Sequence, residues 1–206
     1  MWPLERLLED GVDVTLLFYN PNIHPNVEWQ RRLENALKVS DHYDVPLMIK
    51  GCSLAEEWIK RAEDGRERCR YCYMTRMDCV AQEAVKEGFD AFSTTLLVSP
   101  YQDRELILQE GEKAAANHQI QFIPYDWRDG YRDGQTMAKD IDLYRQKYCG
   151  CVVSLEDSRF SEKIAREHEK IALWECLQTG DFAKEAIRYD KDNWEAMKNA
   201  NKEKVS

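Results

Sequence analysis

The chain has 206 residues, 43% of them hydrophobic and 33% charged, a composition typical of a soluble globular protein with an α/β-sized core. Its net charge of −9 excludes a protein that coats nucleic acid non-specifically, although residues 60–76 carry six basic and three acidic side chains. It has neither a membrane-helix pattern nor a signal-peptide pattern. We therefore expect a cytoplasmic protein whose seven cysteines serve metal or redox chemistry more than structural disulfides.

Helices and strands alternate along the first three quarters of the chain. Apolar periodicity and turn residues predict the elements in order. They are a helix over 2–10 ended by Gly11, a strand over 12–19, a loop over 20–25, a helix over 26–43, a strand over 45–51, a helix over 53–63, a loop over 63–68, a helix over about 70–87, a strand and then a loop over 89–100, a helix over 103–118, a strand over 120–124, a polar loop over 126–134 and a helix over 135–147.

This order predicts an α/β fold with a mostly parallel sheet flanked by helices. We expect the domain to span residues 1–155, and the charged residues 156–206 to form a helical C-terminal extension anchored by Trp174 and Trp194. Ligands of such sheets bind beyond the carboxyl ends of the strands. The polar loops that follow the predicted strands are therefore expected at one edge.

Cys69 and Cys72 form a Cys-x-x-Cys motif where the predicted loop enters a helix. Two thiolates at this spacing can bind one metal ion or cluster because a turn brings both sulfurs to one centre. The neighbouring Arg68, Arg70 and Arg76, with the helix N-terminus, favour the thiolate forms. A structural zinc half-site, or two cysteines without a shared role, is the alternative that these residues leave open.

Cys149 and Cys151 flank a single glycine. The glycine lets the chain bend enough for a strained disulfide, and strained disulfides tend to be reducible, so the pair predicts a reversible two-electron couple. The alternative is a tight turn in which both cysteines simply pack. The remaining cysteines are expected to be buried thiols. They are Cys52, Cys79 and Cys176.

The loop after the best predicted strand carries Asn20, Asn22 and His24. Two amides and an imidazole can bind the polar groups of a base or a ribose. Asparagine and proline are also ordinary turn residues, so plain loop architecture is the alternative.

A second polar loop begins with Asp126, which can hold a metal ion or a proton at the end of a strand. Trp127 and Tyr131 can stack on a base, and Arg128 can bind a phosphate. The alternative is a solvated turn with half-buried aromatic rings. The sequence has no GxGxxG, Walker A or HExxH motif, which gives dinucleotide, P-loop and zincin interpretations no support.

Five segments match one known family in order and spacing. Over about residues 1–155 the chain resembles the cobalamin-independent epoxyqueuosine reductases. The matching segments are FYNPNIHP at 18–25, RCRYCYMTRM at 68–77, EGFDAFSTTLLVSPY at 87–101, DWRDGYRDG at 126–134 and LYRQKYCGC at 143–151.

The resemblance implies a fold similar to nucleotide-binding α/β domains of PP-loop type. It implies reduction of epoxyqueuosine to queuosine at the wobble base of tRNA anticodons. It also implies a [4Fe–4S] cluster, two of whose ligands match Cys69 and Cys72, and a redox-active disulfide that matches Cys149 and Cys151.

The chain departs from the family's pattern at its start. In the family, a strand ending in a CCxPC motif precedes the helix that matches residues 2–10, and its adjacent cysteines complete the cluster. This sequence begins with that helix and has no cysteine before Cys52. We interpret it as shortened relative to the family. A natural variant without a complete cluster is the alternative.

Removing an epoxide oxygen takes two electrons and protons. On the resemblance, we expect Cys69 and Cys72 to hold the cluster while Cys149 and Cys151 relay electrons. An additional iron would act as a Lewis acid on the departing oxygen, with Asp126 as its ligand or as a proton donor.

The expected partners are the tRNA anticodon loop and an unidentified electron donor, with no membrane contact. The basic segment 60–76, which includes Arg76, would meet the anticodon backbone. Tyr71, Tyr73 or Trp127 would stack on a splayed base. The other interpretations are a non-catalytic tRNA-binding protein without the cluster site and a zinc-stabilised nucleotide-binding domain.

Overall fold

The computed structural model describes residues 1–51, 55–60, 65–178 and 183–199. The chain forms two compact units, each discontinuous in sequence. The first combines Met1–Val14 with Glu63–Leu143, and the second combines Thr15–Ala62 with Tyr144–Ser206. This division differs from the expected one, and the boundary after residue 155 stays a prediction about where an extension begins.

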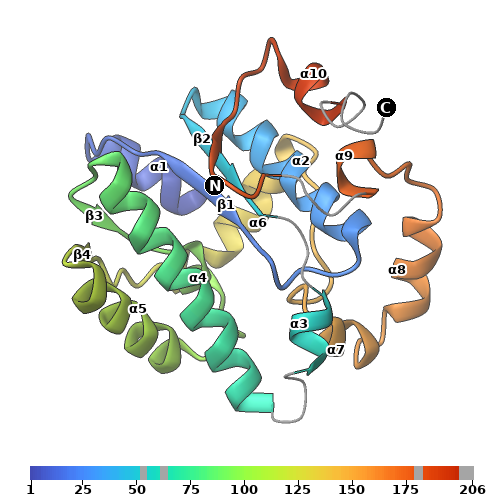
Figure 1. The fold of residues 1–206 in the computed structure, drawn as a ribbon, viewed down its shortest axis with the longest axis horizontal. Helices are drawn as coiled ribbons and strands as arrows, with labels where there is room; N and C mark the ends of the chain where they lie inside the picture. The colour runs from blue at the N-terminus through green and yellow to red at the C-terminus, as the bar shows by residue number, and fades with distance from the viewer. Residues whose placement is uncertain (52–54, 61–64, 179–182, 200–206) are drawn as a thin grey trace. The chain divides into compact units, whose positions relative to one another are not determined.

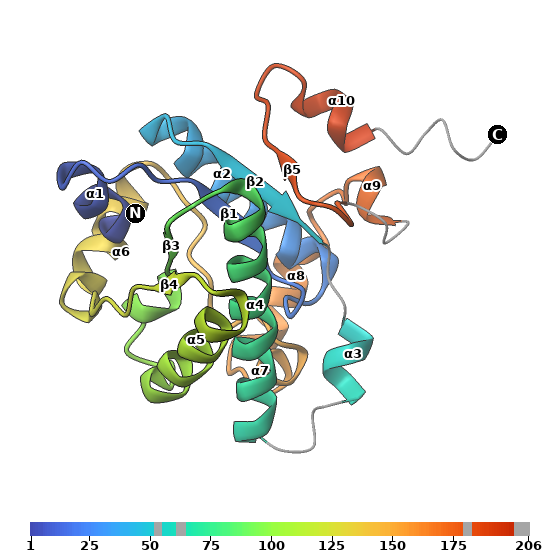
Figure 2. The same ribbon diagram turned by 60° about the vertical axis from the view of Figure 1, so that its left-hand side comes forward.

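The second unit is built around a three-stranded sheet (Figure 2). β1 (Leu16–Tyr19) pairs in parallel with β2 (Leu47–Lys50), and α2 (Asn26–Tyr43) connects the two strands. A short strand, β5 (Ile187–Arg188), adds to β2 in antiparallel orientation. The predicted helix over 26–43 is therefore confirmed, and β5 adds a short strand to the region beyond residue 155, which the sequence predicts as helical.

α2 covers the sheet because its apolar residues recur every fourth position. Trp29, Leu33 and Leu37 form this buried stripe and pack against Phe18 of β1. Trp194 joins the same core, so its predicted role as an anchor is confirmed. The remaining helices of this unit are α3 (Ala55–Lys60), α7 (Val152–Glu156), α8 (Ser161–His168), α9 (Glu175–Gln178) and α10 (Trp194–Asn199).

The first unit contains a smaller, two-stranded parallel sheet. β3 (Ala91–Phe92) pairs with β4 (Gln121–Phe122), and the long helices α4 (Gly65–Glu87) and α5 (Arg104–His118) pack side by side (Figure 1). Gly111 of α5 is required because a Cβ there would lie 2.6 Å from the Phe122 ring. The other elements are α1 (Trp2–Glu9), η1 (Thr95–Val98), η2 (Arg128–Gly130) and α6 (Tyr131–Asp140).

Three predicted helix boundaries are corrected, and the first is the end of α6, which lies at Asp140 instead of residue 147. α4 begins at Gly65, inside the expected loop, and Glu67 in its first turn pairs with Arg70 at 3.4 Å. α6 begins at Tyr131 instead of residue 135, because the helix packs on α1 and the Trp2 ring lies where Gly130 leaves room for it.

The fold is mixed α/β. β1 with β2 and β3 with β4 pair in parallel, but these pairs belong to two small sheets and not to the single, mostly parallel sheet that the sequence predicts. The likeness to PP-loop domains stays a prediction. Among the described residues, no helix is both long and apolar enough to span a bilayer.

Candidate redox and substrate site

In the second unit, the chain turns sharply at Gly150, between two cysteines that both carry thiols. Cys149 is exposed, whereas Cys151 is only 6% exposed. Gly150 has a φ of +114°, and a Cβ there would lie 2.8 Å from Arg32 Nη1 and 2.9 Å from Ile23 Cγ1. Only glycine combines this backbone conformation with this close approach.

The predicted polar loop over 20–25 lies against this turn. The His24 N–H donates to the Gly150 carbonyl at 2.8 Å, and the Tyr148 hydroxyl donates to the His24 carbonyl. The His24–Pro25 peptide bond is cis. The structure thus brings together two motifs that are more than a hundred residues apart in the sequence.

The three predicted substrate-binding residues of this loop differ in their environments. Asn20 is half-buried, and its carbonyl accepts from the Ile23 N–H at 3.2 Å. Asn22 is only 3% exposed, and its Oδ1 atom has no hydrogen-bond partner among the described residues. His24 is half-buried, and burial lowers its pKa although the nearby Glu156 carboxylate opposes this effect. At neutral pH His24 therefore presents a neutral imidazole.

An arginine of α2 donates hydrogen bonds to the backbone carbonyls that precede Gly150. Arg32 donates from Nη1 to the Cys149 carbonyl and from Nη2 to the Tyr148 carbonyl, both at 2.9 Å, and from Nε to Glu28 at 2.8 Å. Sequence reasoning missed Glu28 and Arg32. Their spacing of four residues is a helical ion-pair signal, but the sequence did not indicate that this face of the helix is buried.

The two thiols differ in acidity. The Cys149 pKa is lowered, because the Cys151 thiol and the Ser154 hydroxyl stabilise its thiolate and Arg32 adds a positive charge, which together outweigh the partial desolvation of the sulfur. The Cys149 Sγ lies 2.9 Å from the Ser154 Oγ. The Cys151 pKa is raised by its hydrogen bond to Cys149 and by burial. The Cys149 sulfur is therefore the more acidic of the two, and the Cys151 sulfur is the one that keeps its proton.

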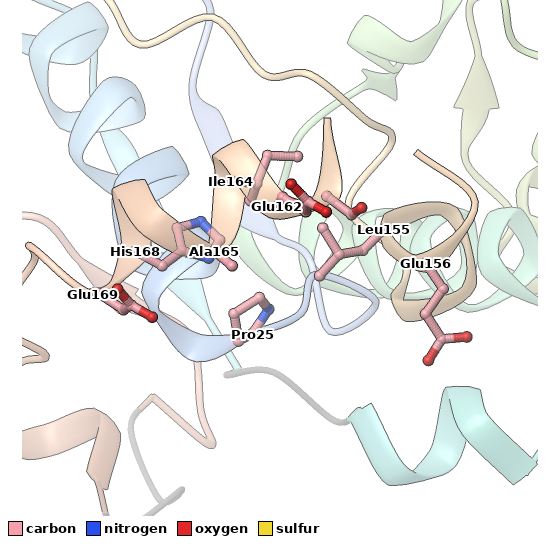
Figure 3. A pocket seen from close by; sticks show the side chains of 9 residues that line it. Pro25, Leu155, Glu156, Glu162, Ile164, Ala165, His168 and Glu169 are labelled. Atoms are coloured by element: carbon pink, nitrogen blue, oxygen red, sulfur yellow. The ribbon is translucent and has the colours of Figure 1, made fainter. Parts of the chain in front are cut away.

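A cavity of about 480 Å³ lies in the same unit (Figure 3). Its wall includes Pro25, the last residue of the polar loop, and Leu155 of α7, the helix that begins directly after Cys151. The His168 side chain also lines it, and three glutamates lie around it. They are Glu156, Glu162 and Glu169.

The first unit contains the Cys-x-x-Cys motif. Cys69 and Cys72 are half-buried on α4, one helical turn apart, so their thiols face the same side of the helix. Arg76 lies one further turn along that side and is also half-buried. Among the described residues, no group of three or more histidine, cysteine or acidic side chains is arranged to bind a metal ion. The spacing of the Cys69 and Cys72 thiols on one side of α4 fits two ligands of a single metal centre.

The second polar loop, in the first unit, is shaped by an ion pair. The Asp126 carboxylate accepts from Arg128 Nε at 2.7 Å and from Nη2 at 2.5 Å, and these contacts lower its pKa to about 2. A carboxylate this acidic carries no proton at neutral pH, which argues against the proton-donor alternative. Trp127 is only 7% exposed and stacks on Tyr125 with ring centroids 4.4 Å apart, so a base would have to displace Tyr125 to reach that face.

The other aromatic and cysteine side chains named from the sequence differ in how deeply they are buried. Tyr73 is 4% exposed and donates to Gln102 at 2.7 Å, whereas Tyr71 is half-buried. Cys79 and Cys176 are buried thiols, as predicted. Cys52 lies outside the described residues.

A dithiol of unequal acidity beside a polar loop is an arrangement that a thiol-based redox enzyme could use. The model of the family Epoxyqueuosine reductase QueH matches residues 1–157. The chain is 35% identical to Epoxyqueuosine reductase QueH of Thermotoga maritima, over 71% of this chain and 82% of that protein. For the proteins of the same name from Dehalococcoides mccartyi and Acinetobacter baylyi, identity is 37% and 34%, over 75% of this chain and 85% and 75% of theirs.

The chain belongs to the epoxyqueuosine reductase QueH family and is an oxidoreductase. The resemblance found in the sequence is thereby confirmed. The iron–sulfur cluster, the disulfide and the missing cysteine motif stay predictions.

Proposed function

We propose that this epoxyqueuosine reductase acts on epoxyqueuosine at the wobble position of tRNA, and that Cys149 and Cys151 form its dithiol–disulfide couple. The observation that carries the proposal is the turn at Gly150. It presents one exposed thiol of lowered pKa and one buried thiol of raised pKa, held by hydrogen bonds to their backbone. This asymmetry is typical of redox-active cysteine pairs.

The electron balance supports this assignment. Converting an epoxide to an alkene breaks both C–O bonds of the ring and consumes two electrons and two protons, and the oxygen leaves as water. Oxidation of the Cys149 and Cys151 thiols to a disulfide releases two electrons and two protons. One dithiol therefore matches one turnover, and an external electron donor must then reduce the disulfide.

The polar loop beside the turn is the proposed contact for the modified base. Asn22 has a buried acceptor without a partner, and such an atom costs free energy until a donor reaches it. His24 is neutral, so it can donate or accept a hydrogen bond without adding charge. Asn20 is the third proposed contact of this loop with the modified base. Proteins usually read RNA bases in this way when the bases are splayed out of an anticodon loop.

Cys69 and Cys72 are the proposed cluster ligands of this chain. A bound [4Fe–4S] cluster would supply electrons one at a time. Arg76 lies on the same side of α4 and would bind a tRNA phosphate. In the second polar loop, Arg128 is exposed and would meet the anticodon backbone, while Trp127 remains a weaker candidate because it is buried.

Asp126 keeps one proposed role, that of a ligand for an additional iron. Its carboxylate is ionised and 44% exposed, as a hard oxygen ligand requires, but an arriving metal ion would have to displace Arg128.

The dithiol is tested with Cys149→Ser and Cys151→Ser, and Cys79→Ala is the matched control because it removes a thiol elsewhere. An anticodon stem-loop that contains epoxyqueuosine is incubated with each variant, and mass spectrometry follows the loss of one oxygen atom. We expect both serine variants to lose conversion and the control to retain it. Conversion at the original rate by either serine variant would contradict the proposal.

The cluster is tested separately by iron and acid-labile sulfide per chain after anaerobic purification. Cys69→Ala and Cys72→Ala should lower both contents, and Cys79→Ala should not. Iron and sulfide contents that stay the same in all three variants would remove Cys69 and Cys72 from the ligand set.

A further inference from the structure

We propose that Arg32 and His168 are positioning residues of the dithiol, joined through the buried Glu28. Residues 161–178, which lie beyond the segment matched by the family model, would then belong to the redox site. This inference rests on the proposed function, in which Cys149 and Cys151 form the redox couple.

Arg32 is the direct support of the turn. Its side chain is only 10% exposed and uses three donor atoms at once, two toward the carbonyls of Tyr148 and Cys149 and one toward Glu28. The planar guanidinium presents its donors in a fixed fork, so these bonds set the distance between α2 and the residues that precede Gly150. A lysine could not make all three bonds in this geometry.

The buried Glu28 carboxylate orients Arg32 by accepting a hydrogen bond from it. Its side chain is fully buried and also accepts from the Tyr144 hydroxyl at 3.0 Å and from His168 Nε2 at 3.0 Å. Burial alone would raise the Glu28 pKa, but the donors from His168, Arg32 and Tyr144 hold it below its ordinary value. The group is therefore an ionised carboxylate, and it keeps Arg32 oriented only while its donors stay in place.

His168 reaches Glu28 because the 161–178 segment holds α2 at several adjacent residues. Glu167 accepts from Lys147 at 2.7 Å and from Arg31 at 3.3 Å. The Gln30 amide donates to the Ala172 carbonyl at 3.1 Å and accepts from the backbone N–H of Trp174 at 2.9 Å. These contacts fix α8 against the helix that carries Glu28 and Arg32.

The arrangement has a consequence for the thiols. Arg32 places a positive charge beside Cys149, and a neighbouring positive charge favours the thiolate. A more stable thiolate favours the reduced form of the couple. His168 acts on the same sulfur indirectly, by keeping Glu28 and hence Arg32 in position.

The test measures the pH dependence of Cys149 alkylation in reduced, anaerobic protein, with the modified peptide quantified by mass spectrometry. The midpoint is the pH at which the alkylation rate of Cys149 is half of its maximum. Arg32→Gln should raise this midpoint by about one pH unit, because a nearby opposite charge contributes a shift of that order. Arg32→Lys should recover part of the shift, because it keeps the charge but loses the fork. His168→Leu should move the midpoint in the same direction by less.

Two matched controls make the assignment specific. Lys38→Gln removes one positive charge from an exposed position of the same helix, α2. Arg166→Gln changes an exposed residue of α8. Both should leave the midpoint in place. An equal shift in Lys38→Gln, or no shift in folded Arg32→Gln, would overturn the role of Arg32.

No shift in folded His168→Leu would overturn the role of the C-terminal segment. If Arg32→Gln does not fold, Arg32→Lys and His168→Leu decide the question. The measurement of this alkylation midpoint requires neither the tRNA substrate nor a bound cluster. A failure of the inference therefore differs from a failure of the proposed function, which would appear as full conversion by Cys149→Ser and Cys151→Ser.

Discussion

The two cysteine pairs reach their geometry by opposite means. Cys69 and Cys72 owe their spacing to α4 itself, since residues three apart on a helix lie on one side. Cys149 and Cys151 owe theirs to contacts from distant residues, including Arg32, which is 117 positions away from Cys149. The first pair depends on local helix formation. The second depends on the fold of a whole unit, so substitutions far along the chain should disturb it.

The largest expected effect that separates the two pairs comes from a glycine near each. Gly150→Ala introduces a Cβ into contact with Arg32 and Ile23 at positive φ. We expect a loss of about 4 kcal/mol in unfolding free energy, measured by urea denaturation, because backbone strain and a clash combine. Gly65→Ala at the start of α4 meets no atom within 4 Å, and should be neutral or stabilising by up to about 1 kcal/mol.

The second-largest loss of stability is expected when the buried carboxylate of Glu28 is replaced. Glu28→Gln leaves Arg32 and His168 without an ionised partner in a fully buried position, and we expect a loss of about 3 kcal/mol in unfolding free energy. Glu162→Gln is the control, since Glu162 is 89% exposed where it pairs with Arg166, and it should change stability by under about 0.5 kcal/mol. Equal effects in both variants would show that Glu28 is not a structural centre.

The next smaller effect concerns the difference in acidity between Cys149 and Cys151. The Cys149 pKa is lowered, so its alkylation rate should already be at its plateau at the pH where an ordinary thiol reaches half of its maximal rate, about 8.5. The rate should fall only when the pH drops below the lowered pKa. Ser154→Ala removes one hydrogen-bond partner of the Cys149 thiolate and should move the midpoint upward by at least as much as Arg32→Gln. A midpoint near 8.5 in the unaltered protein would contradict the description of Cys149.

The smallest effect concerns the polar loop of the first unit. Asp126 and Arg128 are exposed, so Asp126→Asn should leave the midpoint of urea denaturation unchanged. A clear fall in that midpoint would show that the pair organises the loop.

Sequence reasoning captured the features that are local. The bounds of α2, the positions of β1 and β2 and the buried state of Cys79 and Cys176 follow from periodicity and composition over short windows. The two motifs at 20–25 and 149–151 were also identifiable, but nothing in the sequence placed them in contact.

Features that depend on tertiary packing were not predictable in this way. Trp127 reads as an exposed loop aromatic, but Tyr125 covers one face of its ring. His168 meets Glu28 across 140 positions, and no spacing rule connects them. β5 has only two residues, too few to show alternation, and exists because β2 offers it an edge.

The interrupted second unit has a consequence for how the protein is made. Its sheet and its redox turn need residues from both ends of the sequence, from Leu16 in β1 to Arg188 in β5. On the ribosome, the first unit can be complete before the second has received its later half, and such long-range pairing forms slowly. Cys149 and Cys151 therefore leave the ribosome before β5 does, and a reducing environment during synthesis should matter most in this interval.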